Sequence, residues 1–240
     1  MKTEDERMKF KENGVFDIDS WFDVAPPKEG KRQWKQGRSA MELARYMTSD
    51  YPNVPREIEE VLLNFTTADA EFYFRGEHKT AFARHGLGTG EGRNHDAFLW
   101  HGDVVVGIEG KADEPFGSDY IKDAVKSAGE NKMRRINGMI EMLFGDTPEK
   151  HGDLRYQLVT AATATLIEAK MCSVKNAVLL VIVFKGETCE AKNLARNNLD
   201  VDTFLTDISA QKVNDYYYLP TPYGDAYGIR LYFKKIEFDI

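Results

Sequence analysis

The 240-residue chain has few cysteines and no long apolar run. Cys172 and Cys189 are too few for a disulfide scaffold or a zinc cluster, and they suit a reducing compartment. The five histidines show no zinc-site spacing. The longest apolar stretch is the eight residues from Ala177 to Phe184, too short to span a membrane, and the N-terminal segment is charged where a signal peptide would be apolar. The sequence therefore predicts a cytoplasmic protein with no membrane partner.

The chain also lacks an excess of positive charge. Its 32 Lys and Arg residues against 39 Asp and Glu residues give a net charge of −7, which argues against binding nucleic acid through bulk charge but leaves room for a local basic patch. A hydrophobic content of 42% is enough for one sizeable core. We expect one domain in three parts, namely an N-terminal arm and helix (1–55), a core (56–185), and a helix and strand that extend the same domain (186–240).

Hydrophobic periodicity predicts the secondary structure of most of the chain. Helices are expected from a cap at Ser39 to just before Pro52, after Pro55, over 119–144 with a break near Gly129, from about 155 to 169, and over 191–209. Strands are expected at 71–75, in a hairpin over 96–111, at 177–184, and in the final segment from 228. The run at 177–184 does not alternate, which is typical of a strand buried on both faces. Residues 1–37 and the tyrosine-rich region around 216–223 are expected to be irregular.

The hairpin carries the candidate site. Its turn at His101, Gly102 and Asp103 places Asp96 directly across the ladder from Glu109. Because side chains alternate along a strand, Lys111 is expected on the same face as these two carboxylates. Facing carboxylates repel each other unless a positive charge lies between them, and a divalent cation would satisfy both.

Two basic segments flank the hairpin. The sequence RHGLGTGEGR at 84–93 has glycine at 86, 88, 90 and 92, but no GK[ST] follows, so a mobile surface loop is favoured over a phosphate loop. Its Arg84 and Arg93 could still contact a phosphate. On the helix after the hairpin, a second basic surface could do the same, although a solvated charged face is the simpler interpretation; its residues are Lys122, Lys126, Arg134 and Arg135.

The order of elements and the spacing D-x12-E-x-K, formed by Asp96, Glu109 and Lys111, resemble the PD-(D/E)XK nuclease superfamily, also called the restriction-endonuclease-like fold. The resemblance covers about residues 56–185. It implies an α/β (α+β) protein whose αβββαβ core has a central mixed sheet flanked by helices. This chain has His95 where the family places a proline-like residue before the acid.

The resemblance also implies further site residues. In the exonuclease-like branch, a glutamine on the following helix assists the site, and Gln157 matches that placement. Many members carry an upstream glutamate, for which Glu77 is the candidate by position, with Glu71 or Glu60 as alternatives. Oxygen ligands from the two hairpin acids, with the Gly110 carbonyl as a third, suit Mg²⁺ or Mn²⁺ better than Zn²⁺.

The expected function is metal-dependent hydrolysis of a phosphodiester bond in nucleic acid, DNA rather than RNA, and a homodimer is compatible with it. Lys111 would hold the nucleophilic hydroxide or stabilise charge on the phosphorus. Three alternatives stay open. The hairpin could carry only a surface Lys–carboxylate pair, the fold could serve as a non-catalytic module that binds nucleic acid or protein, or a metal-dependent hydrolase could act on another substrate.

Overall fold

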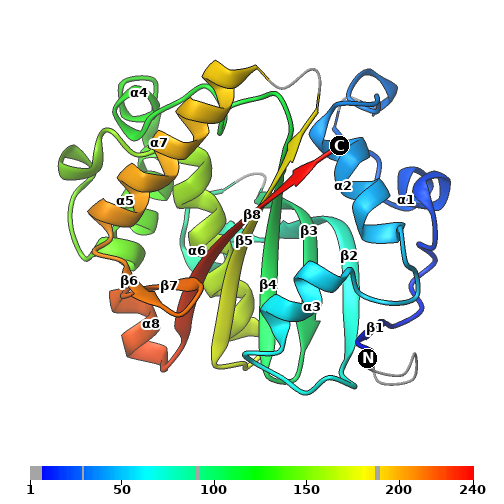
Figure 1. Cartoon of the computed structure of the whole chain (residues 1–240). Coiled ribbons are helices and arrows are strands. Elements are labelled where there is room, and N and C mark those ends of the chain that lie inside the picture. Colours follow the sequence, from blue (N-terminus) through cyan, green and yellow to red (C-terminus); the bar gives the residue numbers. More distant parts are fainter. Residues whose placement is uncertain (1–6, 29, 90–91, 187–189) are drawn as a thin grey trace.

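Helices cover both faces of a mixed sheet (Figure 1). The computed structural model describes residues 7–28, 30–89, 92–186 and 190–240, and within them the sheet has eight strands in the order β1-β2-β3-β4-β5-β8-β7-β6. The strands are β1 (Lys9–Phe10), β2 (Glu71–Thr80), β3 (Arg93–His101), β4 (Val104–Lys111), β5 (Asn176–Lys185), β6 (Gln211–Val213), β7 (Tyr216–Leu219) and β8 (Arg230–Asp239). The helices are α1 (Ile18–Val24), α2 (Ser39–Thr48), α3 (Arg56–Leu62), α4 (Ile121–Lys126), α5 (Glu130–Phe144), α6 (Tyr156–Met171), α7 (Ala191–Asp207) and α8 (Pro222–Tyr227). The predicted α/β class and the order α3-β2-β3-β4-α6-β5 are confirmed.

The hairpin β3–β4 forms in the predicted register. His101 pairs with Val104, which leaves Gly102 and Asp103 as a two-residue turn, and Ala97 pairs with Ile108. The recorded pairing of β3 with β4 ends at Ala97 and Ile108, one residue before Asp96 and Glu109. On its other side, β4 runs parallel to β5, with Glu109 beside Val181. The hairpin is therefore held in the centre of the sheet and not at its edge.

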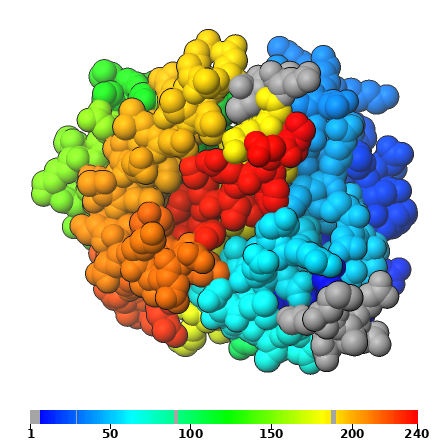
Figure 2. All heavy atoms as spheres, viewed as in Figure 1, coloured from blue at the N-terminus to red at the C-terminus, as the bar shows by residue number. Residues whose placement is uncertain are grey.

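Strand β5 is the buried strand that the apolar run predicts. It lies between β4 and β8 and is parallel to both, and the eight residues between its two ends are buried. Strand β8 pairs with β5 along its whole length. In Figure 2, the red atoms of β8 lie between the orange atoms of α7 and the cyan atoms of α3. The C-terminal segment thus completes the sheet that the core segment begins.

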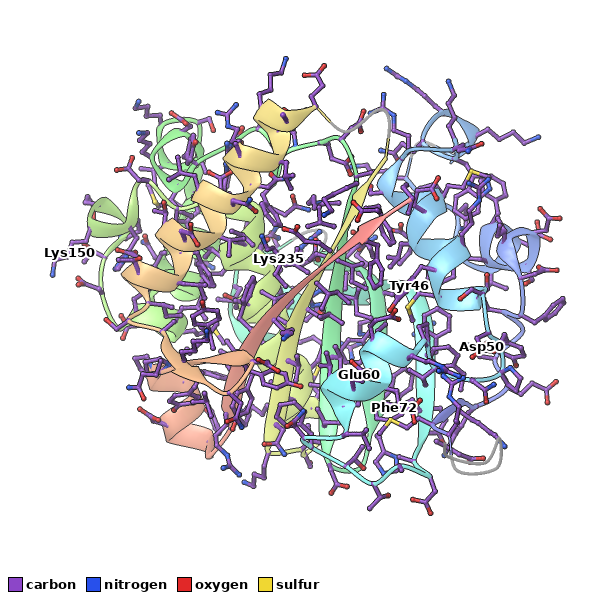
Figure 3. All side chains as sticks on the ribbon, viewed as in Figure 1. Tyr46, Asp50, Glu60, Phe72, Lys150 and Lys235 are labelled. Carbon is purple, nitrogen blue, oxygen red and sulfur yellow. The ribbon has the colours of Figure 1, made fainter. Side chains whose placement is uncertain are left out.

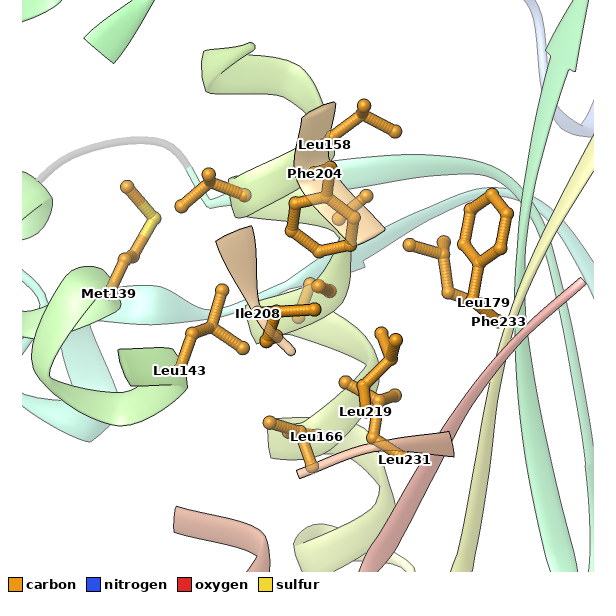
Figure 4. Close-up of a cluster of buried hydrophobic side chains, with 14 of the residues drawn as sticks. Met139, Leu143, Leu158, Leu166, Leu179, Phe204, Ile208, Leu219, Leu231 and Phe233 are labelled. Carbon is orange, nitrogen blue, oxygen red and sulfur yellow. The ribbon is translucent and has the colours of Figure 1, made fainter. Parts of the chain in front are cut away.

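Two apolar layers hold the helices onto the sheet. One lies between the sheet and α5, α6 and α7, and its side chains include Phe204, Leu179 and Phe233 (Figure 4). The other lies between the sheet and α1, α2 and α3. None of the helices in the ranges given above is long and apolar enough to cross a membrane. The site described below lies where both layers reach the ends of β3 and β4.

Several expectations about local structure are wrong. The N-terminal arm is not irregular, because β1 pairs with β2 and Asp17 caps α1 through a capping box with Ser20. The tyrosine-rich region forms the hairpin β6–β7 and helix α8, while the strand expected at 71–75 continues to Thr80. Helix α2 has Arg38 as its N-cap, so Ser39 is its first residue and not its cap. Gly90 of the glycine-rich segment and Cys189 lie outside the described residues.

A buried ion pair joins α6 to α7. Arg155, at the N-terminus of α6, is 1% exposed and donates through Nε to Asp200 of α7 at 2.7 Å. It also donates to the carbonyls of Gly117 and Ser118, at 3.4 and 3.2 Å. Arg155 therefore fixes the segment after β4 and the N-terminus of α6 to the same helix.

Replacing Arg155 with Met should lower the free energy of unfolding by about 3–5 kcal/mol, because Asp200 is left buried and unpaired. The Arg155→Met/Asp200→Leu double variant should recover most of this loss. Urea unfolding measures both effects. Lys122→Met, which breaks the exposed Lys122–Asp153 pair, is the control and should cost at most about 1 kcal/mol. A double variant no more stable than Arg155→Met would show that the ion pair is not the cause.

Candidate active site at the ends of strands β3 and β4

Strand β3 does not alternate regularly where it carries Asp96. Phe98 belongs to the apolar layer against α6, and His95 lies on that same side, with Nε2 3.5 Å from the Thr165 hydroxyl of α6. Asp96 instead lines a cavity formed with residues of α2, on the opposite side. The expectation that Asp96 and Glu109 share one face of the sheet is therefore wrong, although the turn and the pairing from His101 back to Ala97 are as predicted.

Glu109 is buried at the centre of a hydrogen-bond network. Its side chain has no exposure, and its oxygens contact Arg93, which forms an ion pair with it, His95 at 3.2 Å, and Gln157, which donates from Nε2 at 3.1 Å. Burial alone would raise the pKa of this carboxyl, but the positive charge of Arg93 and the bond to His95 outweigh it and hold the pKa below its usual value. Glu109 is therefore a carboxylate at neutral pH.

Asp96 and Glu77 lie on neighbouring strands beside Glu109. Gly76 pairs with Ala97 and His78 with His95, so Glu77 lies opposite Asp96, and its φ of +47° marks a departure from regular strand geometry. Burial and then the charge of Glu109 raise the pKa of Asp96 to about 6. Burial and then the charge of Asp96 raise the pKa of Glu77 to about 7. These two carboxylates therefore lack enough compensating positive charge.

The Asp96 carboxylate also contacts the backbone of β4. Its Oδ2 accepts a hydrogen bond from the Gly110 N–H at 2.9 Å. The N–H and C=O of one strand residue point to the same side of the strand, so the Gly110 carbonyl is directed toward Asp96 as well. Gly110 is therefore a neighbour of Asp96, and its role as a metal ligand stays a prediction.

Lys111 supplies positive charge that acts on two of the carboxylates. Its side chain is buried, with Nζ 5.4 Å from the centre of the Phe116 ring. Its charge lowers the pKa values of Asp96 and Glu109, opposing the effect of burial on both. The three residues of the predicted motif therefore do act on one another in the folded chain.

A glycine in β4 makes room for the network. A Cβ on Gly107 would lie 2.5 Å from the Thr165 hydroxyl and 2.6 Å from the ring of His95. Since real Cβ atoms essentially never approach this closely, His95 could not reach Glu109 past any larger residue.

The other predicted residues divide into two groups. Gln157 contacts Glu109 as expected, and Arg93 and Arg135 line a cavity beside it. By contrast, Arg84 is exposed, and the remaining three basic candidates form surface ion pairs: Lys122 with Asp153, Lys126 with Asp123, and Arg134 with Glu130.

Of the alternatives for the upstream glutamate, Glu60 is exposed on α3 (Figure 3), and Glu71 is exposed at the far end of β2, where its carbonyl contacts His101. Of the three candidates, Glu77 is the glutamate that lines a cavity together with Asp96.

The sequence did not single out the basic residues beside Asp96. The cavity that Asp96 and Glu77 line has a volume of 480 Å³, and Arg32, Lys35 and Arg38 also line it. These cations belong to the segment KEGKRQWKQGR at 28–38, whose charge density could have signalled the patch in a chain of net charge −7.

The donor set suits a hard divalent cation in part. Asp96, Glu77 and the Gly110 carbonyl offer oxygen atoms. Burial, and then the charge of a neighbouring carboxylate, raises the pKa values of both carboxyls, and a bound cation would oppose both effects. Glu109 already has Arg93 as its counter-ion. Within the described residues, no three His, Cys, Asp or Glu side chains are grouped closely enough to hold a metal ion by themselves.

The chain is thus an α/β protein with a carboxylate cluster at the ends of adjacent strands. Residues 15–236 match the family described as a domain of unknown function (DUF6946), and the chain belongs to that family. No curated protein and no solved structure matches it.

The cluster should make stability depend on pH. The pKa values of Asp96 and Glu77 are raised in the folded state, so the free energy of unfolding should fall as pH rises from about 4 to about 7. Asp96→Asn keeps an acceptor for Gly110 and removes one repelling charge. The variant should therefore be more stable than the wild type by roughly 1–3 kcal/mol at pH 8, with the difference vanishing near pH 4. Urea unfolding in EDTA at each pH measures the free energy of unfolding of both proteins. A difference between the variant and the wild type that does not change with pH would contradict the prediction.

Proposed function

We propose that the protein is a metal-dependent phosphodiester hydrolase that cleaves nucleic acid. The observation that carries the proposal is the composition of the 480 Å³ cavity, where Asp96 and Glu77 face a lining that includes three basic side chains. Carboxylates hold a metal ion and basic side chains hold the phosphates of a polyanion, so the two together suit a phosphodiester substrate. Glu109 and Lys111, the other residues of the motif, do not line this cavity, but their charges act on Asp96.

The residues have distinct roles in this proposal. Asp96, Glu77 and the Gly110 carbonyl would hold Mg²⁺ or Mn²⁺, with Glu109 as a further acid of the site. When bound, the metal polarises a phosphoryl oxygen and lowers the pKa of a coordinated water. Lys111 places a buried ammonium near the carboxylates, where it can hold a hydroxide or stabilise the charge that develops on the phosphorus.

Gln157 and Arg93 position Glu109 and do not themselves act on the phosphate that is cleaved in this scheme. Both donate to the same oxygen, Oε2, so they fix the carboxylate in one orientation from α6 and from β3. Because Arg93 neutralises Glu109, the net charge of the cluster stays low enough for a polyanion to approach. DNA as the preferred substrate, a cytoplasmic location and a homodimer belong to the same proposal.

One observation favours a second candidate, a non-catalytic module that binds nucleic acid through the same surface. Each oxygen of Glu109 already contacts a protein side chain, Oε1 contacting His95 and Oε2 contacting Arg93 and Gln157. A carboxylate with these partners stabilises the fold. It could bind metal or substrate only after giving up one of its contacts with Arg93, His95 or Gln157. The experiments below separate the two candidates.

Lys111→Met should abolish cleavage and leave metal affinity within about twofold of the wild type, because the substitution removes the ammonium but keeps most of the side-chain volume. Cleavage of linear, circular and single-stranded DNA and of RNA is measured with Mg²⁺ and with Mn²⁺, and metal binding by calorimetry. Asp96→Asn should weaken both cleavage and metal binding.

The control for this experiment is Lys150→Gln, since Lys150 forms an exposed pair with Asp146 on the opposite side of the molecule from α2 (Figures 1 and 3). Cleavage by Lys111→Met at the wild-type rate would refute the role of Lys111. Binding without cleavage by the wild type, with every substrate and both metals, would favour the module.

The Arg32→Gln/Lys35→Gln double variant should weaken nucleic-acid binding about tenfold or more at low salt and reduce the slope of log K against log salt by about 1–2, because each contact to a phosphate releases a counter-ion. Fluorescence anisotropy with labelled DNA measures both. The matched control is Lys122→Gln/Lys126→Gln, whose side chains form surface ion pairs. Equal losses in both double variants would contradict a specific basic patch.

A further inference from the structure

We propose that a second cavity, on the α6 side of Glu109, binds one unpaired nucleotide of the substrate strand. The cavity has a volume of 360 Å³, within the range of about 300–1,000 Å³ typical of small-molecule sites. This inference rests on the proposed function for its ligand class, and it adds that the substrate is single-stranded, or frayed at an end, where the nucleotide enters.

The lining of the cavity combines rings with groups that bind polar atoms. Phe82, Phe116 and Tyr156 supply aromatic surface, on which the face of a base can stack. Arg93 and Arg135 supply guanidinium groups, which bind phosphate and the polar edges of bases. A site for phosphate alone would not need the three rings.

One of these guanidinium groups has unused hydrogen-bonding capacity. Arg93 contacts Glu109 through an NH2 group, while its Nε is buried and has no hydrogen-bond partner among the described residues. A buried donor without a partner is costly, and a turn of the Arg93 side chain toward the cavity would let a bound phosphate oxygen or base carbonyl accept from it. Asp119, also in the lining, can accept from an amino group of a base or a sugar hydroxyl.

Hydrogen bonds to the glycine-rich segment hold α5, which carries the lining residue Arg135. The side chain of Asn131 accepts from the Thr89 N–H at 2.5 Å and donates to its carbonyl at 2.6 Å, and Arg135 donates to the carbonyls of Leu87 and Thr89, both at 3.3 Å. The described part of the glycine-rich segment is thus fixed against the helix. A site that is already formed costs little ordering on binding.

The location of the cavity connects it to the proposed chemistry. Arg93 and Gln157 line it and both bond to Glu109, whose charge in turn acts on Asp96 and Glu77. A nucleotide held here therefore lies next to Glu109, while Asp96 and Glu77 line the other cavity, on the α2 side. A base that is stacked and paired within an intact duplex cannot place its face on these rings, so the cavity favours single strands and ends.

The test is calorimetric binding of the four deoxynucleoside 5′-monophosphates, in EDTA, to the full chain. Inorganic phosphate and deoxyadenosine are titrated separately. We expect a monophosphate to bind at least tenfold more tightly than either fragment, because only the nucleotide can use the rings and the guanidinium groups together. Arg135→Gln and Tyr156→Leu should each weaken nucleotide binding about tenfold or more, whereas Tyr156→Phe, which keeps the ring, should stay within about threefold.

Arg230→Gln is the control, since Arg230 is exposed at the start of β8. Thermal unfolding checks that each variant is folded, and Tyr156→Phe against wild type keeps the test decisive if Tyr156→Leu does not fold. Inorganic phosphate binding as tightly as the nucleotides would overturn the proposal, as would equal losses in Arg230→Gln and Arg135→Gln. Nucleotide binding with the expected losses in the variants supports the nucleotide site even if no nucleic acid is cleaved. Cleavage of nucleic acid without nucleotide binding refutes this site but does not contradict the proposed hydrolase activity.

Discussion

The architecture of the site depends on one carboxylate that water does not reach. A buried charge is stable only with partners, and those of Glu109 come from two other elements, Arg93 and His95 from β3 and Gln157 from α6. These contacts hold the β3–β4 hairpin against α6. They also require glycine at position 107, because a Cβ there would clash with the ring of His95. The raised pKa values of Asp96 and Glu77 follow in part from the negative charge that is fixed there.

Local pattern was sufficient to predict the centre of the fold. The turn residues set the register of β3 and β4, because a two-residue loop leaves one pairing, and the apolar run identified β5, because a strand covered on both faces has no polar side. The placement of Gln157 against the hairpin came from resemblance and not from periodicity, and the contact with Glu109 confirms it. These features depend on neighbours in sequence or on a shared motif.

The features that the sequence did not reveal depend on departures from regular geometry. Strict alternation puts Asp96 on the face of Glu109, but the backbone between His95 and Phe98 turns two successive residues to the α2 side, and Glu77 takes a positive φ opposite them. The basic segment at 28–38 has no periodicity, so only the fold shows that Arg32 and Lys35 lie beside Asp96. The hairpin β6–β7 was missed because the prolines at 220 and 222 suggested an irregular segment, whereas they follow β7 and begin α8.

The pairing of β8 with β5 also has a consequence for where the chain can be divided. Residues 56–185 contain the whole αβββαβ succession. Without β8, however, the backbone of β5 would be unpaired on one side along ten residues, and the apolar side chains of this strand would lie at an open edge of the sheet. Such an edge is a template for the addition of another strand, from a second copy or from a growing aggregate. Residues 230–239 therefore act as a protective cover for the most apolar strand of the protein, and a fragment defined by motif boundaries alone would be prone to self-association.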